Sequence, residues 1–512
     1  MNIFKSIVDS NQKSLSFYST VLFYCQMVLL VLYLLTLSVD YKYKELPSGF
    51  YGVLYRIKPA DYMMIFFILT CILRYDLKWK CPYIFWAVLV NIGAFSFATF
   101  IAHYYGYAIS NSYTSYTSWA VPFCTEIFYL IGFLALYNFI ASVSWNTWKL
   151  ILHFIVTSMS VYGLIGIYDM AADTYGCPKL SVCSAYLLSN NIDMVEMSEK
   201  HLFMGTFANQ GRASGFYFCI AFLSLINMTL LPKNKKLLYG IFLWVPFTVI
   251  FLTLARAAWI AVIISSFLVM VLSFFEHKYF ISRLFQYLWI AFMTAIIFVL
   301  FVSISPEFLQ LATSKFVGTK KESITADNDY LTFQTNKDNT LLQMNKENTP
   351  LNKEDTPSKP LLIQQQKQSV RHGGILYELQ NGFVGRELAV AFKTFCKHPL
   401  GYGYFGYPVQ NIGNKAIYYH NFFLRSMVEG GVLGIIIYIS LIVILLLEPI
   451  LIHGVSLKNL GITSIYIPFV IGVILLSVHG MFLTRSVYLV MALILALNSI
   501  DCQPKPQNNG DA

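Results

Sequence analysis

Long apolar runs separated by short polar stretches dominate the chain. A helix that crosses a bilayer needs about 20 mostly apolar residues. Candidate spans lie at residues 17–38, 61–75, 82–103, 119–142, 149–170, 214–231, 237–255, 257–275, 284–304, 425–448, 462–479 and 482–500. The second of these runs is short, and the seventh and eighth are nearly continuous. This pattern predicts an all-α fold, a polytopic transmembrane helical bundle of about 12 helices.

The composition supports a membrane protein. Of 512 residues, 57% are hydrophobic and only 12% are charged, whereas a soluble domain carries roughly 25% charged residues. The net charge of +10 is scattered between the apolar runs, so we predict no nucleic-acid partner. The first apolar run, Phe17 to Val39, is too long for a cleavable signal core and lacks a small-residue cleavage site. We expect it to remain as a signal anchor.

The positions of lysine and arginine in the short loops predict the orientation. Cytoplasmic loops are enriched in these residues, and alternate loops here carry most of them, although Lys42, Lys44, Arg56 and Lys58 oppose the trend. The bias favours a cytoplasmic N-terminus at 1–16 and a cytoplasmic tail at 501–512. The cytoplasmic loops would then hold Lys5, Lys13, Arg74, Lys78, Lys80, Lys149, Lys233, Lys235, Lys236, Lys278, Arg283 and Lys458.

Two long polar segments then fall outside the cytoplasm. Helices one to nine occupy 17–304, and helices ten to twelve occupy 422–500, so the long extracytoplasmic loop between helices 9 and 10 spans 305–421. Its part at about 319–370 is a Lys/Asn-rich insertion with too few apolar residues to offset the entropy of ordering, which predicts disorder. From Leu376 onward, apolar residues recur at helical spacing, which predicts an amphipathic helix near the membrane surface.

The other long outer segment, about 171–213, contains two cysteines. The chain has nine cysteines, with no CxxC pair and no Cys/His cluster at zinc spacing, so no metal site is predicted. Cys177 and Cys183 share this polar segment. They either form a disulfide, as an extracytoplasmic location permits, or remain two free thiols.

Several ionisable residues fall on the predicted outer face. Such residues at membrane depth are costly, which favours a functional role. Arginines suit an anionic headgroup such as a diphosphate, because the guanidinium offers forked donors to phosphate oxygens and stays charged. Each arginine could instead snorkel to lipid headgroups, Glu429 could simply accept hydrogen bonds from Arg425 one turn earlier, and His479 and Arg485 fit a structural role best. The candidates are Arg212, Arg256, Arg386, His420 and Glu429.

Four short patterns occur in order along the second half of the chain. They are GRASGF at 211–216, LARAAWIA at 254–261, Gly385-Arg386 followed by HPLGYG at 398–403, and HNFFL at 420–424 followed by EGGVLG at 429–434. Together they resemble the O-antigen ligase and polymerase superfamily of bacterial envelope glycosyltransferases. Ala255 stands where that family often has Ser, and Gly401 where it often has a second Leu. The insertion at 319–370 is not typical of the family.

The resemblance implies a function and roles for these residues. The donor would be a glycan on undecaprenyl diphosphate at the periplasmic face of the bacterial inner (cytoplasmic) membrane, transferred without cofactor or metal to an acceptor hydroxyl. Arg212, Arg256 and Arg386 would bind the diphosphate and stabilise its developing charge. His420 would be the general base, and Glu429 would orient His420 or a nearby arginine.

Several functions remain open at this point. O-antigen ligase, with a lipid A core acceptor, comes first, followed by a surface polysaccharide polymerase and then a protein O-oligosaccharyltransferase. A different class, a transporter or flippase of lipid-linked oligosaccharides, would place charges at the midplane and often show internal repeats, and the sequence shows neither. A non-catalytic membrane scaffold is the remaining alternative.

Overall fold

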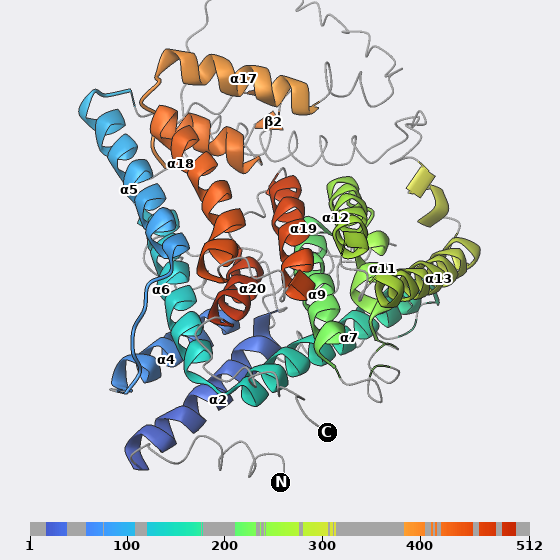
Figure 1. Cartoon of the computed structure of the whole chain (residues 1–512). Coiled ribbons are helices and arrows are strands. Elements are labelled where there is room, and N and C mark those ends of the chain that lie inside the picture. Colours follow the sequence, from blue (N-terminus) through green and yellow to red (C-terminus); the bar gives the residue numbers. More distant parts are fainter. Residues whose placement is uncertain are drawn as a thin grey trace, which may run out of the picture. The chain divides into compact units, whose positions relative to one another are not determined.

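The structure is a computed structural model, drawn in Figure 1, and it divides the chain into two compact units, 1–308 with 386–512 and 309–385. Almost all described residues belong to the first unit, which carries everything discussed below. The residues described are 17–37, 58–74, 76–107, 120–175, 177, 210–231, 236, 240, 242–275, 280–305, 308–310, 312–313, 383–404, 411–412, 415–416, 421–453, 460–477 and 484–497. The predicted disordered insertion at 319–370 lies outside them.

Every predicted apolar run contains a helix, which confirms the all-α polytopic fold. The helices are α2 (Phe17–Leu37), α4 (Pro59–Leu73), α5 (Tyr83–Tyr104), α6 (Ala120–Ser142), α7 (Trp145–Tyr175), α9 (Gln210–Leu230), α11 (Trp244–Leu252), α12 (Arg256–Phe275), α13 (Phe280–Ile304), α18 (Phe422–His453), α19 (Leu460–Leu476) and α20 (Arg485–Ala496). A further helix, α17 (Phe383–Lys397), lies in the region predicted to be amphipathic, and the only β-structure described is a two-stranded pair, β1 (Asn411–Ile412) with β2 (Lys415–Ala416).

Not all of these helices have the length of a full span. Within the described residues, eight helices are long and apolar enough to cross a membrane, and three shorter apolar helices accompany them. The nine residues of α11 rise only roughly 14 Å, under half of the hydrocarbon thickness of about 30 Å. The near-continuous run at 237–275 therefore divides into a short buried α11 and a full-length α12.

The helices bury one part of their surface and expose another that is equally apolar. Large side chains such as Phe267 on α12, Phe285 on α13 and Ile436 on α18 are more than half exposed. A soluble monomer rarely exposes apolar surface on this scale. These faces are therefore the surface that the lipid solvates in a multi-pass membrane protein.

Pairs of helices distant in sequence pack side by side. α5 lies against α18, α12 against α19, and α20 against α6, while α2 packs on α4. Figure 1 shows α5 and α18 adjacent, with α19, α12 and α9 grouped next to one another. The packing of α18 on α5 is what positions the candidate site.

Polar contacts link the helix ends that the predicted alternation assigns to the same face. At the predicted outer face, Arg485 at the start of α20 pairs with Asp61 at the start of α4, 2.6 Å apart. At the opposite face, Glu448 near the end of α18 accepts the backbone N–H groups of Tyr83 and Ile84, at 2.7 and 2.9 Å. This carboxylate satisfies amides of the first turn of α5, which have no partner within their own helix.

Candidate functional site

Helix α18 has a kink that forms a docking point for a distant segment. At Gly431 the backbone leaves the helical conformation, with φ 62° and ψ −147°. The segment after α17 pairs with this break: Tyr402 N–H donates to Val428 O at 3.0 Å and Gly403 N–H to Glu429 O at 2.9 Å. In return, Val432 N–H donates to Pro399 O at 2.8 Å. Backbone groups freed by the kink are thus satisfied by the segment that docks there.

Glycine is required at this junction for both conformation and space. Gly401, Gly403 and Gly431 all have positive φ, at 89°, 73° and 62°, a region that side chains with a Cβ rarely adopt. A Cβ on Gly431 would collide with the backbone of Pro399 and Leu400, and one on Gly403 with the backbone of Thr99. The glycines of the HPLGYG and EGGVLG patterns therefore allow two backbones to approach each other closely.

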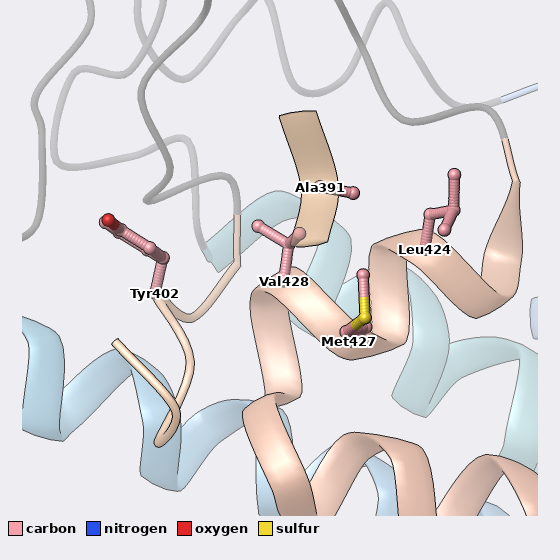
Figure 2. Packing of buried hydrophobic residues seen from close by; sticks show 5 residues of the cluster. All are labelled: Ala391, Tyr402, Leu424, Met427 and Val428. Carbon is pink, nitrogen blue, oxygen red and sulfur yellow. The ribbon is translucent and has the colours of Figure 1, made fainter. Parts of the chain in front are cut away.

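A small apolar cluster fixes α17 on the first part of α18. Ala391, fully buried on α17, packs with Leu424, Met427 and Val428 of α18 and with Tyr402 of the docked segment. Figure 2 shows Ala391 facing Val428 and Met427 across this contact. The helix that carries Arg386 is thereby held beside the helix that begins just after His420.

His398 directly follows α17 and stacks on Tyr107, which lies just after the end of α5. Its ring lies 4.0 Å from that of Tyr107, at an interplanar angle of 15°, and Tyr107 Oη donates to Gly401 O at 3.1 Å. Burial lowers the pKa of His398, and the adjacent charge of Lys397 lowers it further. His398 is therefore held as a neutral stacking partner that supports the docked segment.

An ionic cluster adjoins this junction. Arg425 Nε donates to Glu429 Oε2 at 2.9 Å, and an Nη of Arg425 lies 3.7 Å from Glu126 Oε1. Tyr404 Oη donates to Glu126 Oε2 at 2.7 Å, while Tyr404 N–H donates to Thr99 Oγ1 at 3.0 Å. Burial, together with the neighbouring Glu126 carboxylate, raises the pKa of Tyr404, so that its phenol stays protonated as the donor. Three elements, α6, α18 and the docked segment, meet in this Glu126–Tyr404–Arg425–Glu429 cluster.

A second distinctive turn joins α11 to α12. Leu254, buried in this turn, has a positive φ of 51°, which is uncommon for a residue with a branched side chain and is concentrated at functional sites. Trp259 Nε1 donates to Phe251 O at 3.1 Å and so bridges the break between the helices. Arg256, the first residue of α12, is exposed. The tryptophan of the LARAAWIA pattern thus holds the turn that presents Arg256.

The predicted site residues are described to different extents. Arg212 is the third residue of α9 and Arg386 the fourth of α17, but both side chains lie outside the described part, as does all of His420. Glu429 is completely buried, and its partner is Arg425, as one of the sequence interpretations held. The meeting of the three arginines at one diphosphate stays a prediction.

The alternatives of a disulfide or two free thiols at Cys177 and Cys183 both stay predictions. Cys177 is described and exposed, whereas Cys183 lies outside the described residues. Among the residues that the structure describes, no group of three or more His, Cys, Asp or Glu side chains could hold a metal ion.

The sequence reasoning missed Glu126 and Tyr404. The available signal for Glu126 was an acidic residue near the start of an otherwise apolar span, which by itself favours a functional hypothesis. Tyr404 gave no signal, since it is one aromatic residue among 35 tyrosines and 42 phenylalanines. Only the fold reveals its hydrogen bond to a residue 278 positions away.

Comparison with known proteins returned one finding. Residues 241–439 match a family model described as O-antigen ligase. The match runs from just before α11 into α18 and includes Arg256, Arg386, His420 and Glu429, so it confirms the resemblance seen in the sequence. It supports a membrane enzyme of the O-antigen ligase or polymerase type. No curated protein and no solved structure matches the chain.

Proposed function

We propose, from the O-antigen ligase match at residues 241–439 and the geometry at the kink of α18, that this chain is a membrane glycosyltransferase. It moves a glycan from undecaprenyl diphosphate to an acceptor hydroxyl at the periplasmic face of the bacterial inner membrane. O-antigen ligase, with a lipid A core acceptor, is the first choice.

The observation that carries the proposal is the docking of residues 399–403 onto the kink of α18. Three backbone hydrogen bonds of 2.8 to 3.0 Å join two of the four family-like patterns. As a result, the helix that carries Arg386 is fixed next to the helix whose first residue, Phe422, follows His420 by two positions. This arrangement supports a shared site for an arginine that grips the diphosphate and a histidine that serves the acceptor.

The chemistry needs few groups, because a lipid diphosphate is already a good leaving group. His420 takes the proton of the acceptor hydroxyl as its oxygen attacks the anomeric carbon. The bond from that carbon to the diphosphate oxygen breaks, and the arginines stabilise the charge that develops there. Direct attack inverts the anomeric centre. Because Glu429 pairs with Arg425, we assign it to orienting that arginine.

Site substitutions test this assignment. Arg386→Ala and His420→Ala should each lower glycan transfer about 100-fold or more, the range seen when one transition-state donor or base is removed, while the protein inserts normally. Lys393→Ala is the matched control, because Lys393 is an exposed cation on the same helix, and it should keep transfer within about twofold. Full transfer by Arg386→Ala at normal protein levels would contradict the proposed site.

The surface glycan that a deletion strain still makes identifies the acceptor. Loss of all surface glycan with an intact core indicates the ligase, whereas surface glycan of a single repeat indicates the polymerase. Loss confined to protein-bound glycan indicates protein glycosylation. A purified protein that moves labelled lipid-linked glycan across vesicles without transferring it would instead favour the flippase.

A further inference from the structure

We propose that Glu126 is a positioning residue of the transfer site, although it lies more than a hundred residues before the matched region. Through Arg425 and Tyr404, its carboxylate fixes the start of α18 against the docked segment that follows α17. This inference rests on the proposed function and adds a residue from α6 to it.

The geometry shows why Glu126 differs from Glu429. Glu429 lies one turn after Arg425 on the same helix, so this pair can set the rotamer of the arginine but cannot place α18 relative to another element. Glu126 comes from α6 and contacts both other partners, Tyr404 Oη at 2.7 Å and Arg425 at 3.7 Å. It is the contact through which three separate elements share one polar cluster.

The position of the cluster links it to the proposed base. Asn421 caps α18, since its side-chain oxygen accepts the N–H of Phe423 at 2.8 Å, and its backbone oxygen accepts the N–H of Arg425 at 2.9 Å. His420 is the residue immediately before this cap. Anything that holds Arg425 in place therefore also holds the capped start of α18, which follows His420 in the sequence.

The charges of the cluster also support a positioning role for Glu126. Two carboxylates, Glu126 and Glu429, flank the guanidinium of Arg425 and balance its charge within the protein. The side chains of Glu126 and Arg425 are 26% and 22% exposed, whereas that of Glu429 is completely buried. Glu429 is thus the most enclosed member of the cluster, whereas Glu126 and Arg425 are partly exposed.

The test uses Glu126→Gln in the full-length protein, reconstituted with lipid-linked glycan and acceptor. Glutamine keeps the shape of the side chain and an oxygen that accepts from Tyr404, so the substitution removes the charge while the fold is retained. We expect kcat per folded molecule to fall about 10- to 100-fold, the range caused by small misplacement of a catalytic group, while KM for the donor stays within about twofold. Glu126→Asp, which restores the charge on a shorter arm, should recover part of the loss.

Glu448→Gln is the matched control. Glu448 is a buried carboxylate near the other end of α18 and, within the described part of the chain, accepts hydrogen bonds from backbone amides of α5. Its substitution should lower the amount of folded protein and leave kcat per folded molecule unchanged. If Glu126→Gln behaves in the same way, or keeps the wild-type kcat, Glu126 is merely structural and the inference is overturned.

A second readout does not depend on transfer. A cysteine introduced by His420→Cys should react with a soluble maleimide at a rate that changes at least about fivefold when Glu126→Gln is added, because the start of α18 is then held less firmly. An unchanged rate overturns the inference. If the wild-type protein transfers no glycan, the proposed function fails, while this labelling still decides the role of Glu126.

Discussion

Gly431→Ala should undock the segment that follows α17 from α18. Gly431 combines φ 62° with ψ −147°, close to a conformation that is essentially restricted to glycine. Its missing Cβ faces Pro399 O and the backbone of Leu400 and Gly401. These are main-chain atoms, which cannot rotate away as the end of a flexible side chain can.

The magnitude follows from the contacts that the added methyl group removes. To accept it, the segment must move and lose three backbone hydrogen bonds, from Tyr402, Gly403 and Val432. At about 1 kcal/mol each, the docked state loses about 3 kcal/mol. Since 1.4 kcal/mol is a factor of ten, the equilibrium for local opening shifts about 100-fold.

Hydrogen exchange of the amides of Tyr402, Gly403 and Val432 measures this opening directly and should become about 100-fold faster. The control is Gly93→Ala on α5, where a Cβ would meet nothing within 4 Å and alanine is preferred in a helix by about 1 kcal/mol. Glycan transfer should fall for Gly431→Ala and stay unchanged for Gly93→Ala. Exchange and transfer that match the control would refute the role assigned to this junction.

Three other outcomes are expected. Asp61→Asn leaves the largely buried Arg485 without its counter-charge. Breaking such a pair costs about 3–5 kcal/mol, so the thermal unfolding temperature should fall. An unchanged unfolding temperature would show that the pair does not stabilise the fold. The pKa of His398 is lowered in the folded protein, so its stabilising contribution is complete above its ordinary pKa of about 6.5 and is lost as pH falls through the folded value. The acid-induced loss of stability should therefore be smaller in His398→Gln than in the wild-type protein. Identical pH profiles of stability would contradict this. Deletion of 322–368 should leave glycan transfer largely intact, and loss of transfer at normal protein levels would show that the insertion takes part.

The apolar runs predicted most of the fold because each span satisfies a local requirement. A helix in lipid must pair its own backbone and be apolar over its length, and both properties can be read from about 20 consecutive residues. Where the sequence was less exact, at 237–255, the run held only the short α11, because an apolar run does not distinguish a buried helix from a spanning one. The amphipathic region before 398 was likewise visible from its spacing and contains α17.

For the candidate site, the sequence singled out charged residues but did not predict the contacts that the structure shows among Glu126, Tyr404, Arg425 and Glu429. Arg386, His420 and Glu429 could be singled out because ionisable residues are conspicuous in a chain of this composition. That Glu429 binds Arg425 was one of two interpretations, and helical spacing could not choose between them. The hydrogen bond between Glu126 and Tyr404 could not be predicted, because neither local sequence indicates which distant residue it contacts.

By itself, the sequence predicted the all-α polytopic fold and the order of its apolar helices along the chain. Only the tertiary structure decided that α18 breaks at Gly431, that the HPLGYG segment fills this break and that α6 supplies Glu126 to Arg425. The reason is physical: spans form through local hydrogen bonds and transfer into lipid, whereas a kink and a buried ion pair exist only once backbone and charges distant in the chain meet and satisfy each other.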